Sequence, residues 1–386
     1  MRFGPNDEQR DLQRSARAFF SRELPSERLR RGLDDGGFER DLWNAAARLG
    51  WIGALVPEGY GGSGLALGDL TMVLEEAGRA VAPLPLVETA VIGALVLGSA
   101  ASPARAGEWL AALAGGTLIV AMGPGLAGGR RAGIPVTARR DGDTWLIAGS
   151  AEIVPFGADS DIVLTLAQTA LGPTLFAVPT ASPGSSATPV DLADRTARAA
   201  RVEYDGVRVT PDHVLGEPGA GAAVLEPIVR AARAALCADM VGGAQRAIEL
   251  SVEYAKQRVQ FDRPIGSFQA IKHKLADMQL ALEGMRGLAY AAASAAGGSG
   301  SDDPIVEVAQ AVCNDGYRMI ASEAIQVHGG IGFTWEHDLH LYYKRALRLR
   351  ATLGTSSELY HTVATALLAG RGFVSYDEER GAAAAP

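Results

Sequence analysis

The sequence predicts an α+β protein in which a helical N-terminal domain, a middle β domain and a C-terminal helical bundle follow one another. Apolar residues recur with the period of an amphipathic helix before about residue 115 and again after about residue 221. Short β-branched runs separated by Gly, Pro and Asp turns fill the stretch between them. The length of 386 residues suits two to three domains, which are expected at 1–115, 116–213 and 214–380, followed by a disordered tail at 381–386.

The first domain is expected to be helical because it combines a cap with apolar spacing. Asn6 is placed to cap the first helix, since its side-chain oxygen can accept a hydrogen bond from a free amide of the first turn. The apolar residues that recur on one face of this helix are Leu12, Ala16, Phe19 and Phe20. Two further helices are expected, at 40–49 and at about 67–80, with the turn-rich segment 56–62 between them.

The middle domain is expected to form a β barrel or sandwich. Its strand-like runs include 117–122, 145–147, 162–164 and 175–178. After Gly221 the helical period returns, and a long helix is expected from about Leu225 to about Arg258. A Gly/Ser-rich loop at 297–301 precedes a further helix that begins at about Pro304.

Composition and charge exclude several classes of function. The net charge is −8 and no long basic run occurs, which argues against a nucleic-acid partner. The two cysteines, Cys237 and Cys313, form no Cys-x-x-Cys pair, so neither a disulfide framework nor a cysteine zinc site is expected. No apolar run approaches the roughly 20 residues of a membrane span, and the N-terminus lacks the apolar region of a signal peptide. A cytoplasmic location is therefore expected.

Two local motifs are rejected by their context. Residues 123–128 match the Gly-x-Gly-x-x-Gly dinucleotide fingerprint, but Gly133, Pro135 and an expected strand follow where the fingerprint requires a helix. Residues 336–340 hold four metal-capable side chains, yet no third histidine lies at a helical spacing, and a polar helix start explains the run equally well. No metal site is predicted.

Two other segments suggest a ligand that carries phosphates and a planar ring. Arg258 and Arg263 lie in the turn expected after the long helix, where they can contact a diphosphate, and Phe261 offers an aromatic face. Segment 326–332 places three glycines in a short turn after a helix, which permits close approach to a ligand or another chain.

The order of the three domains and these two segments resemble the acyl-CoA dehydrogenase family, and the resemblance extends over nearly the whole length. It includes the run Val-Pro-Glu-Gly-Tyr-Gly-Gly-Ser-Gly at 56–64. The run 332–338 is similar to a bacterial branch that acts on CoA thioesters of steroid side chains and related bulky acids. The resemblance implies a tetramer that binds FAD between subunits, an acyl-CoA substrate and a separate electron acceptor, which the sequence does not identify. It also implies which residues hold the ADP portion of the FAD seated in a neighbouring subunit, namely Arg258, Phe261, Gln269, Gln326 and Gly330.

The reaction implied by the resemblance needs a carboxylate that this chain lacks at the usual position. In the family, a Glu removes the α-proton of the thioester while the β-hydrogen leaves as hydride to the flavin. The corresponding position holds Leu353, and the alternative position on the long helix holds Ala232. The nearest acids on that helix are Asp239 and Glu226, and neither has the spacing of the family.

The expected seat of the flavin ring also departs from the family pattern. Met122-Gly123-Pro124 stands in place of Thr-Glu-Pro, and Ile153-Val154-Pro155 stands in place of Trp-Ile-Thr. Three hypotheses follow. In the first, the chain is a base-lacking subunit of a heterotetrameric FAD-dependent acyl-CoA dehydrogenase, and a sister chain supplies the Glu and the ring seat. In the second, the chain forms a homo-oligomeric dehydrogenase with a relocated base such as Asp239. In the third, the chain is a non-redox scaffold that kept the fold.

Overall fold

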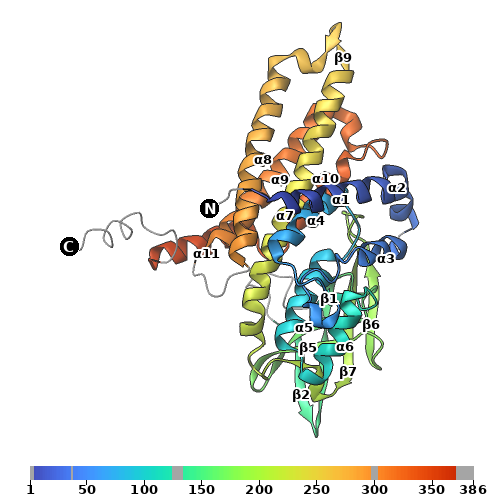
Figure 1. Cartoon of the computed structure of the whole chain (residues 1–386), viewed down its shortest axis with the longest axis vertical. Coiled ribbons are helices and arrows are strands. Elements are labelled where there is room, and N and C mark those ends of the chain that lie inside the picture. The colour runs from blue at the N-terminus through green and yellow to red at the C-terminus, as the bar shows by residue number, and fades with distance from the viewer. Residues whose placement is uncertain (1–3, 36–37, 124–133, 297–302, 371–386) are drawn as a thin grey trace, which may run out of the picture.

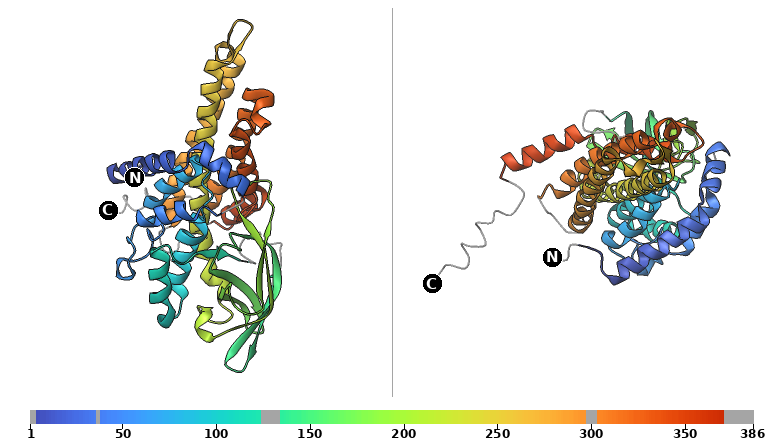
Figure 2. Two further views of the ribbon diagram at one scale, coloured as in Figure 1. Left: turned by 90° about the vertical axis from the view of Figure 1, so that its right-hand side faces the viewer. Right: turned by 90° about the horizontal axis from the view of Figure 1, so that it is seen from above.

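The computed structural model describes residues 4–35, 38–123, 134–296 and 303–370. Figures 1 and 2 show an elongated molecule with the β-sheet at one end of the long axis and the tip between α7 and α8 at the other. The N-terminal helices lie between these two ends. The α+β class and the order of helices, sheet and helical bundle are confirmed. The expected tail at 381–386 and the loop at 297–301 lie outside the described residues.

The N-terminal helices begin with the expected cap. Asn6 Oδ1 accepts a hydrogen bond from the Gln9 amide at 2.8 Å, and the Gln9 side chain accepts one from the Asn6 amide at 3.0 Å. The buried face of the first helix packs its Phe19 ring against Trp51 at 4.9 Å. The elements of this part are α1 (Asp7–Glu23), α2 (Ser26–Asp35), α3 (Arg40–Arg48), η1 (Glu58–Tyr60), α4 (Leu67–Arg79), the π-helix η2 (Leu86–Gly93), α5 (Ala94–Ala100) and α6 (Pro103–Ala114).

The middle strands form one open sheet. They are β1 (Val120–Met122), β2 (Val136–Asp141), β3 (Thr144–Pro155), β4 (Ile162–Thr169), β5 (Gly172–Pro179), β6 (Ser185–Val190), β7 (Ala199–Val209) and, after the short helix η3 (Pro211–His213), β8 (Val214–Leu215). Their order is β6-β7-β3-β2-β4-β5-β8, with β1 parallel to β4. After Gly123, the rest of the rejected fingerprint lies outside the described residues, and the next described element is the strand β2.

Of the two forms expected for this domain, a barrel or a sandwich, the described strands do not form a closed barrel. Among the described strands, β6 and β8 end the sheet and do not pair with each other. The physical reason lies in strand β4, whose two faces enter different cores. Its residues Ile162, Leu164 and Leu166 pack with the helices. Residues on the opposite face pack within the curled sheet, where the Trp145 ring lies 5.5 Å from the Phe176 ring. Helices therefore cover one face of this strand, and the curled sheet encloses the other face.

The C-terminal bundle is built around the 37-residue helix α7. Its elements are α7 (Gly221–Gln257), the hairpin strands β9 (Val259–Gln260) and β10 (Arg263–Pro264), η4 (Ile265–Ser267), α8 (Gln269–Ala296), α9 (Ile305–His328), η5 (Gly329–Phe333), α10 (Leu339–Leu349) and α11 (Ser356–Leu368). Both cysteines are buried and free. Among the helices in the described ranges, none combines the length and the apolar character needed to cross a bilayer.

Glycines bring α4 and α7 into backbone contact. A Cβ atom added at Gly242 would lie 1.7 Å from the Glu75 carbonyl oxygen, and one added at Gly78 would lie 2.1 Å from the Asp239 carbonyl oxygen. No larger residue fits at either position without moving a helix. This crossing places the middle of α7 beside the segment that follows α4, where the cavity described next is found.

Candidate active site

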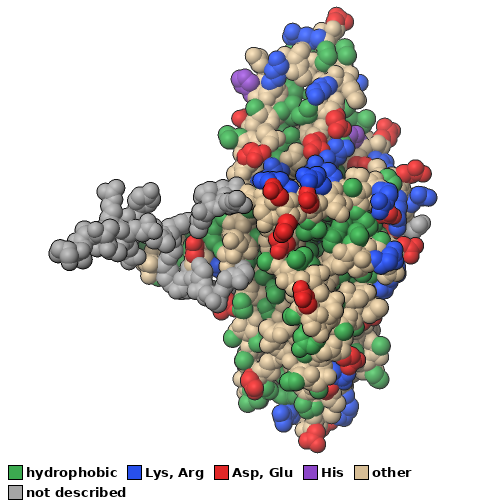
Figure 3. Space-filling view, viewed as in Figure 1, with side chains coloured by type: hydrophobic (Ala, Val, Ile, Leu, Met, Phe, Trp, Pro, Cys, Tyr) green, Lys and Arg blue, Asp and Glu red, His purple; other side chains and the backbone are tan. Residues whose placement is uncertain are grey.

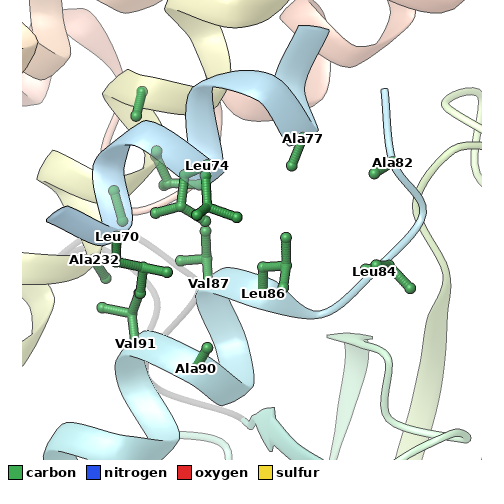
Figure 4. Packing of buried hydrophobic residues seen from close by; sticks show 14 of the residues in the cluster. Leu70, Leu74, Ala77, Ala82, Leu84, Leu86, Val87, Ala90, Val91 and Ala232 are labelled. Carbon is green, nitrogen blue, oxygen red and sulfur yellow. The ribbon is translucent and has the colours of Figure 1, made fainter. Parts of the chain in front are cut away.

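A cavity lies where α4, η2, α7 and α10 meet the turn after β3. The space inside it is about 30 Å³, enough for one or two water molecules. Much of its wall is apolar, and Figure 4 labels the side chains concerned. They are Leu74, Ala77, Ala82, Leu84, Leu86 and Val87. A wall of this kind suits the hydrocarbon part of a ligand and excludes water from it.

The other wall of the cavity carries paired charges. Arg345 Nη2 donates to Asp239 Oδ2 at 3.0 Å and to the Ala82 carbonyl at 3.2 Å. One turn further along α10, Arg348 Nε donates to Asp194 Oδ2 at 2.7 Å. Burial raises the pKa of Asp239, and Arg345 offsets this only in part. Burial by itself would also raise the pKa of Asp194. The nearby cations Arg348 and Arg345 outweigh this effect, so the pKa of the Asp194 carboxyl is lowered.

A second carboxyl group of the cavity, that of Glu88, was missed by the sequence reasoning. It lies on the π-helix η2 and lines the cavity. Burial raises the pKa of Glu88 above its ordinary value. One sequence signal could have found it, because Glu88 is the single charged residue between Arg79 and Arg105. Single π-helical turns are frequent at functional sites, which adds weight to this position.

The position expected for the catalytic Glu lies in a tightly held loop. Leu353 is 4% exposed and packs in the main core, with a positive φ of 58°. Three buried or half-buried side chains fix the backbone of this loop. Gln310 Nε2 donates to the Thr352 carbonyl at 2.8 Å, and Arg233 Nε donates to the Leu353 carbonyl at 3.1 Å. Asn314 Nδ2 donates to the carbonyl of the next residue at 3.3 Å. The loop is well ordered although it holds no carboxylate at the expected position.

The other two positions considered for a base differ in their surroundings. Ala232 is fully buried in α7 and lies among apolar residues in Figure 4. Glu226 is exposed near the start of the same helix. Of the acids that the sequence reasoning considered, Asp239 is thus the one that lines the cavity, and it does so as the partner of Arg345.

The segment expected to seat the flavin ring adjoins the cavity. Ile153 is 57% exposed, whereas Val154 is buried beside a register shift between β3 and β7. Phe156, with a positive φ of 54°, turns the chain and lines the cavity. At Gly123 an added Cβ would lie 2.4 Å from the Leu164 carbonyl oxygen, so no side chain fits there. The ring seat therefore offers backbone groups and apolar surface.

The five residues expected to hold the ADP portion are all exposed at the far end of the bundle. Phe261, at the tip of the β9–β10 hairpin, is 86% exposed with a φ of 54°. The Tyr254 ring stacks on His328 at 4.4 Å, which joins the ends of α7 and α9. Lys and Arg side chains gather over this end of the molecule in Figure 3. We refer to these five residues as the outer set: Arg258, Phe261, Gln269, Gln326 and Gly330.

The outer set and the cavity lie far apart in one chain. Asp239 belongs to α7 and Arg258 is the residue directly after its end at Gln257, so the rise of an α-helix separates the two positions by about 28 Å. Figure 1 shows the same separation, with the hairpin at one end of the long axis and the sheet toward the other. The structure thus brings the outer set to one end of the molecule, but it does not bring that set to the ring seat of the same chain.

The polar run 336–340 serves packing and ion pairing in the described structure. Asp338 Oδ1 accepts from Arg30 Nε at 2.7 Å. His340 is buried against the Trp335 ring at 4.5 Å, and His337 lies 4.6 Å from His328. Over the described ranges, no group of three or more His, Cys, Asp and Glu side chains is arranged to hold a metal ion.

Comparisons with known proteins agree with this architecture. Family models for the N-terminal and C-terminal domains of acyl-CoA dehydrogenases match residues 6–117 and 219–368. Acyl-CoA dehydrogenase IpdE2 of Mycobacterium tuberculosis is 33% identical over 81% of this chain and 82% of its own length. The ChsE4-ChsE5 complex from the same organism matches with a TM-score of 0.87 at 26% identity, covering 95% of this chain and 99% of the other. A structure described as an FAD-dependent dehydrogenase matches with a TM-score of 0.85 at 28% identity, covering 95% and 99%.

The fold and the comparisons define an oxidoreductase class. The chain belongs to the acyl-CoA dehydrogenase family. The family and enzyme class expected from the sequence are thereby confirmed.

Proposed function

We propose that this chain is one subunit of an FAD-dependent enzyme that desaturates an acyl-CoA thioester, and that a sister chain supplies the catalytic carboxylate and the ring seat. The observation that carries the proposal is the loop at Leu353. It keeps an ordered backbone, held by Gln310, Asn314 and Arg233, but presents a buried leucine. A leucine cannot accept the α-proton, so the carboxylate must come from elsewhere.

The outer set fits the ADP portion of FAD. Arg258 supplies a cation for the diphosphate, and Phe261 supplies an exposed aromatic face for the adenine. The short ribityl chain that joins the diphosphate to the isoalloxazine cannot bridge the roughly 28 Å along α7 between Arg258 and the cavity. The outer set therefore serves the FAD whose ring lies in a neighbouring subunit. When bound, FAD accepts the hydride from the β-carbon.

The ring seat of this chain supports a heteromeric assembly. In place of hydroxyl and indole groups it offers Ile153, Pro155 and the bare backbone of Gly123, which orient a flavin poorly. The ChsE4-ChsE5 structure shows that a protein similar to this chain occurs in a complex of two different subunits. We infer a heterotetramer in which this chain contributes outer sets to FAD molecules seated in its sister.

A specific observation favours a second candidate, a homo-oligomer with a relocated base. Asp239 and Glu88 both line the cavity, and Asp239 Oδ1 has no hydrogen-bond partner among the described residues. Asp239 is nevertheless paired with Arg345 through Oδ2, and an ion pair of this kind weakens a carboxylate as a base. A scaffold without a redox role is the third candidate.

Flavin content separates these candidates. The chain is purified alone and after co-expression with a sister acyl-CoA dehydrogenase, and FAD per chain is measured from the flavin absorption band. The proposal predicts little FAD in the lone chain and stoichiometric FAD in the complex. A lone chain that retains FAD and is bleached by an acyl-CoA would favour the homo-oligomer. A complex that forms without FAD would favour the scaffold.

A further inference from the structure

The outer set has two parts that belong to different elements. Three of its residues, Arg258, Phe261 and Gln269, lie between the end of α7 and the start of α8. The other two, Gln326 and Gly330, lie in the last turn of α9 and in η5. All five are exposed, and within the described residues no hydrogen bond or ion pair joins the first part to the second. The residues beneath them therefore fix how the two parts lie relative to each other.

Three aromatic rings beneath the outer set connect its two parts. The Tyr254 ring, one turn before Arg258, stacks on the His328 ring with the centroids 4.4 Å apart. His328 is the last residue of α9 and lies two positions from each residue of the second part. The His337 ring lies 4.6 Å from the His328 ring. The turn after α9 packs closely on this helix, because a Cβ added at Gly332 would lie 3.1 Å from His328 Cβ. We call the rings of Tyr254, His328 and His337 the ring stack.

Backbone hydrogen bonds fit the neutral form of both imidazoles of the ring stack. His328 Nδ1 donates to the Ala324 carbonyl at 2.8 Å, because a carbonyl oxygen can only accept. Nε2 of the neutral ring is then an acceptor, and it is buried without a partner among the described residues. His337 Nδ1 accepts from the Leu339 amide at 3.1 Å. A second proton would therefore lack an acceptor at His328 and would displace the Leu339 amide at His337.

The surroundings of His328 do not offset a positive charge on its ring. The residue is 4% exposed, and its ring contacts are the Tyr254 ring from α7 and the His337 ring from the segment after η5. Over the described ranges, no carboxylate forms an ion pair with it. Burial lowers the pKa of His328, the hydrogen bond to Ala324 raises it less, and His337 lowers it further. A proton on His328 is therefore a buried, uncompensated charge, and separating the rings to admit water relieves its cost.

The neighbouring histidines lie among charges of both signs. Burial lowers the pKa of His337, and the charged groups around this ring are Asp338, Arg30, Arg246 and Glu253. Burial and Lys344 lower the pKa of His340, whose ring contacts Trp335, to about 4. His340 therefore stays neutral in mild acid, where His328 and His337 are the groups of this region that take up protons.

We propose that Tyr254 and His328 are positioning residues for FAD: their stacked rings hold the two parts of the outer set together, and a proton on His328 separates the rings and weakens FAD binding. This inference rests on the proposed function, because it takes the outer set as the site of the ADP portion. It adds to that site a dependence on pH. Since the pKa of His328 is lowered, the contact is complete above the ordinary histidine pKa of about 6.5 and is lost as the pH falls through the lower pKa of the closed stack.

The first test is a pH profile of FAD binding by the purified oligomer, with the sister chain present, from about pH 7.5 to about pH 4.5. The dissociation constant, followed by flavin fluorescence, should rise about tenfold or more in acid, since each pH unit below the pKa of a required neutral group shifts the equilibrium by up to about tenfold. His328→Phe keeps an aromatic ring that takes up no proton, so its dissociation constant should stay within about twofold over the range. His361→Phe, at an exposed position of α11, is the matched control and should keep the wild-type profile. A pH dependence that survives in His328→Phe would overturn the inference.

A second pair of variants tests the stacked contact itself at neutral pH. Tyr254→Phe keeps the ring and should bind FAD as the wild type does. Tyr254→Ala removes the ring that joins α7 to α9, so it should bind FAD about threefold or more weakly. Tyr254 is only half-buried, so the variant is expected to fold, and circular dichroism verifies this. Equal FAD binding by Tyr254→Ala and the wild type would refute the positioning role.

Hydrogen exchange of the lone chain distinguishes a failure of this inference from a failure of the proposed function, because it needs no FAD. Exchange of the amides at 325–333 is compared between the wild type and His328→Phe at each pH, so the intrinsic pH dependence of exchange cancels. The wild type should exchange faster than the variant in acid and at the same rate at neutral pH. Equal exchange at every pH would show that protonation does not open the ring stack. If the exchange rates differ as expected but the oligomer holds no FAD, the proposed function fails, and with it the role of the stack in FAD binding, while the pH-sensitive contact itself stands.

Discussion

Under the proposed function, single residues of the loop at 352–354 explain how a catalytic position can be lost while the backbone that carried it persists. Leu353 adopts a left-handed backbone conformation, which a non-glycine residue populates at some energetic cost. Hydrogen bonds from Gln310 and Asn314, both on α9, hold the two neighbouring carbonyls. The loop backbone is therefore held by its surroundings and not by the side chain at position 353, which packs in the main core.

This reasoning predicts the behaviour of Leu353→Glu. The lone wild-type chain, reconstituted with FAD, should show negligible desaturation in single-turnover flavin bleaching with an acyl-CoA. The variant should recover little activity, because the ring seat lacks orienting contacts and a misplacement of about 1 Å can cost around a hundredfold in rate. Asp239→Asn and Glu88→Gln serve as comparisons in the same assay. Fast bleaching by the unmodified lone chain that either variant abolishes would instead identify that residue as a relocated base.

At the same scale, Arg258→Ala should weaken FAD retention in the assembled oligomer. A charge-assisted contact to a diphosphate contributes about 1.5 to 3 kcal/mol, which corresponds to a loss of affinity of about tenfold or more. FAD per oligomer after dialysis measures the effect. Arg139→Ala, an exposed arginine on β2, is the matched control and should retain FAD as the wild type does. Equal FAD content in the two variants would remove Arg258 from the site.

Among the secondary-structure elements, the crossing of α4 and α7 positions the cavity. Gly242 lets the backbone of α7 approach Glu75, and Gly78 does the same at Asp239. The close approach brings Leu74 and Ala77 of α4 opposite Leu236 of α7, and all three line the cavity. The two glycines of this crossing thus shape the cavity by setting how closely α4 and α7 approach each other, and they do not contact a ligand.

Gly242→Ala should therefore destabilise the protein by about 3 kcal/mol or more, because its Cβ would lie 1.7 Å from the Glu75 carbonyl oxygen and the helices would have to separate. Gly284→Ala in α8 meets no atom within 4 Å and should be neutral or stabilising by up to about 1 kcal/mol. Denaturant unfolding monitored by circular dichroism compares the two. Similar stabilities for both variants would contradict the close crossing.

For the whole molecule, the proposed function makes the isolated chain an incomplete unit, because the outer set lies far from the cavity. Figure 1 places the hairpin that carries Phe261 at the opposite end of the long axis from the sheet. In the proposed cofactor site, the outer set and the ring seat of one chain are too far apart to bind the same FAD. The functional unit is therefore expected to be an oligomer in which ends of different chains meet.

Sedimentation tests this expectation directly. The complex with a sister chain should sediment as a tetramer, and dissociating it by dilution should release FAD in parallel with the loss of the tetramer, since binding is shared between chains. Free and bound FAD are followed by flavin fluorescence across the same dilution series. A monomer that retains FAD and desaturates an acyl-CoA would exclude the shared site.

Local sequence patterns alone determined the helical ends, the β-rich middle and the family resemblance. The caps and periodicities that define them act over a few residues, as at Asn6 and in the glycine-rich turn 326–332. The choice between a barrel and a sandwich stayed open, because it depends on what covers each face of β4, and only the tertiary packing decides this. The charged wall was also decided by tertiary structure. Asp239 and Arg345 are 106 positions apart in the chain, and no local pattern shows that α7 and α10 bring them to within 3.0 Å.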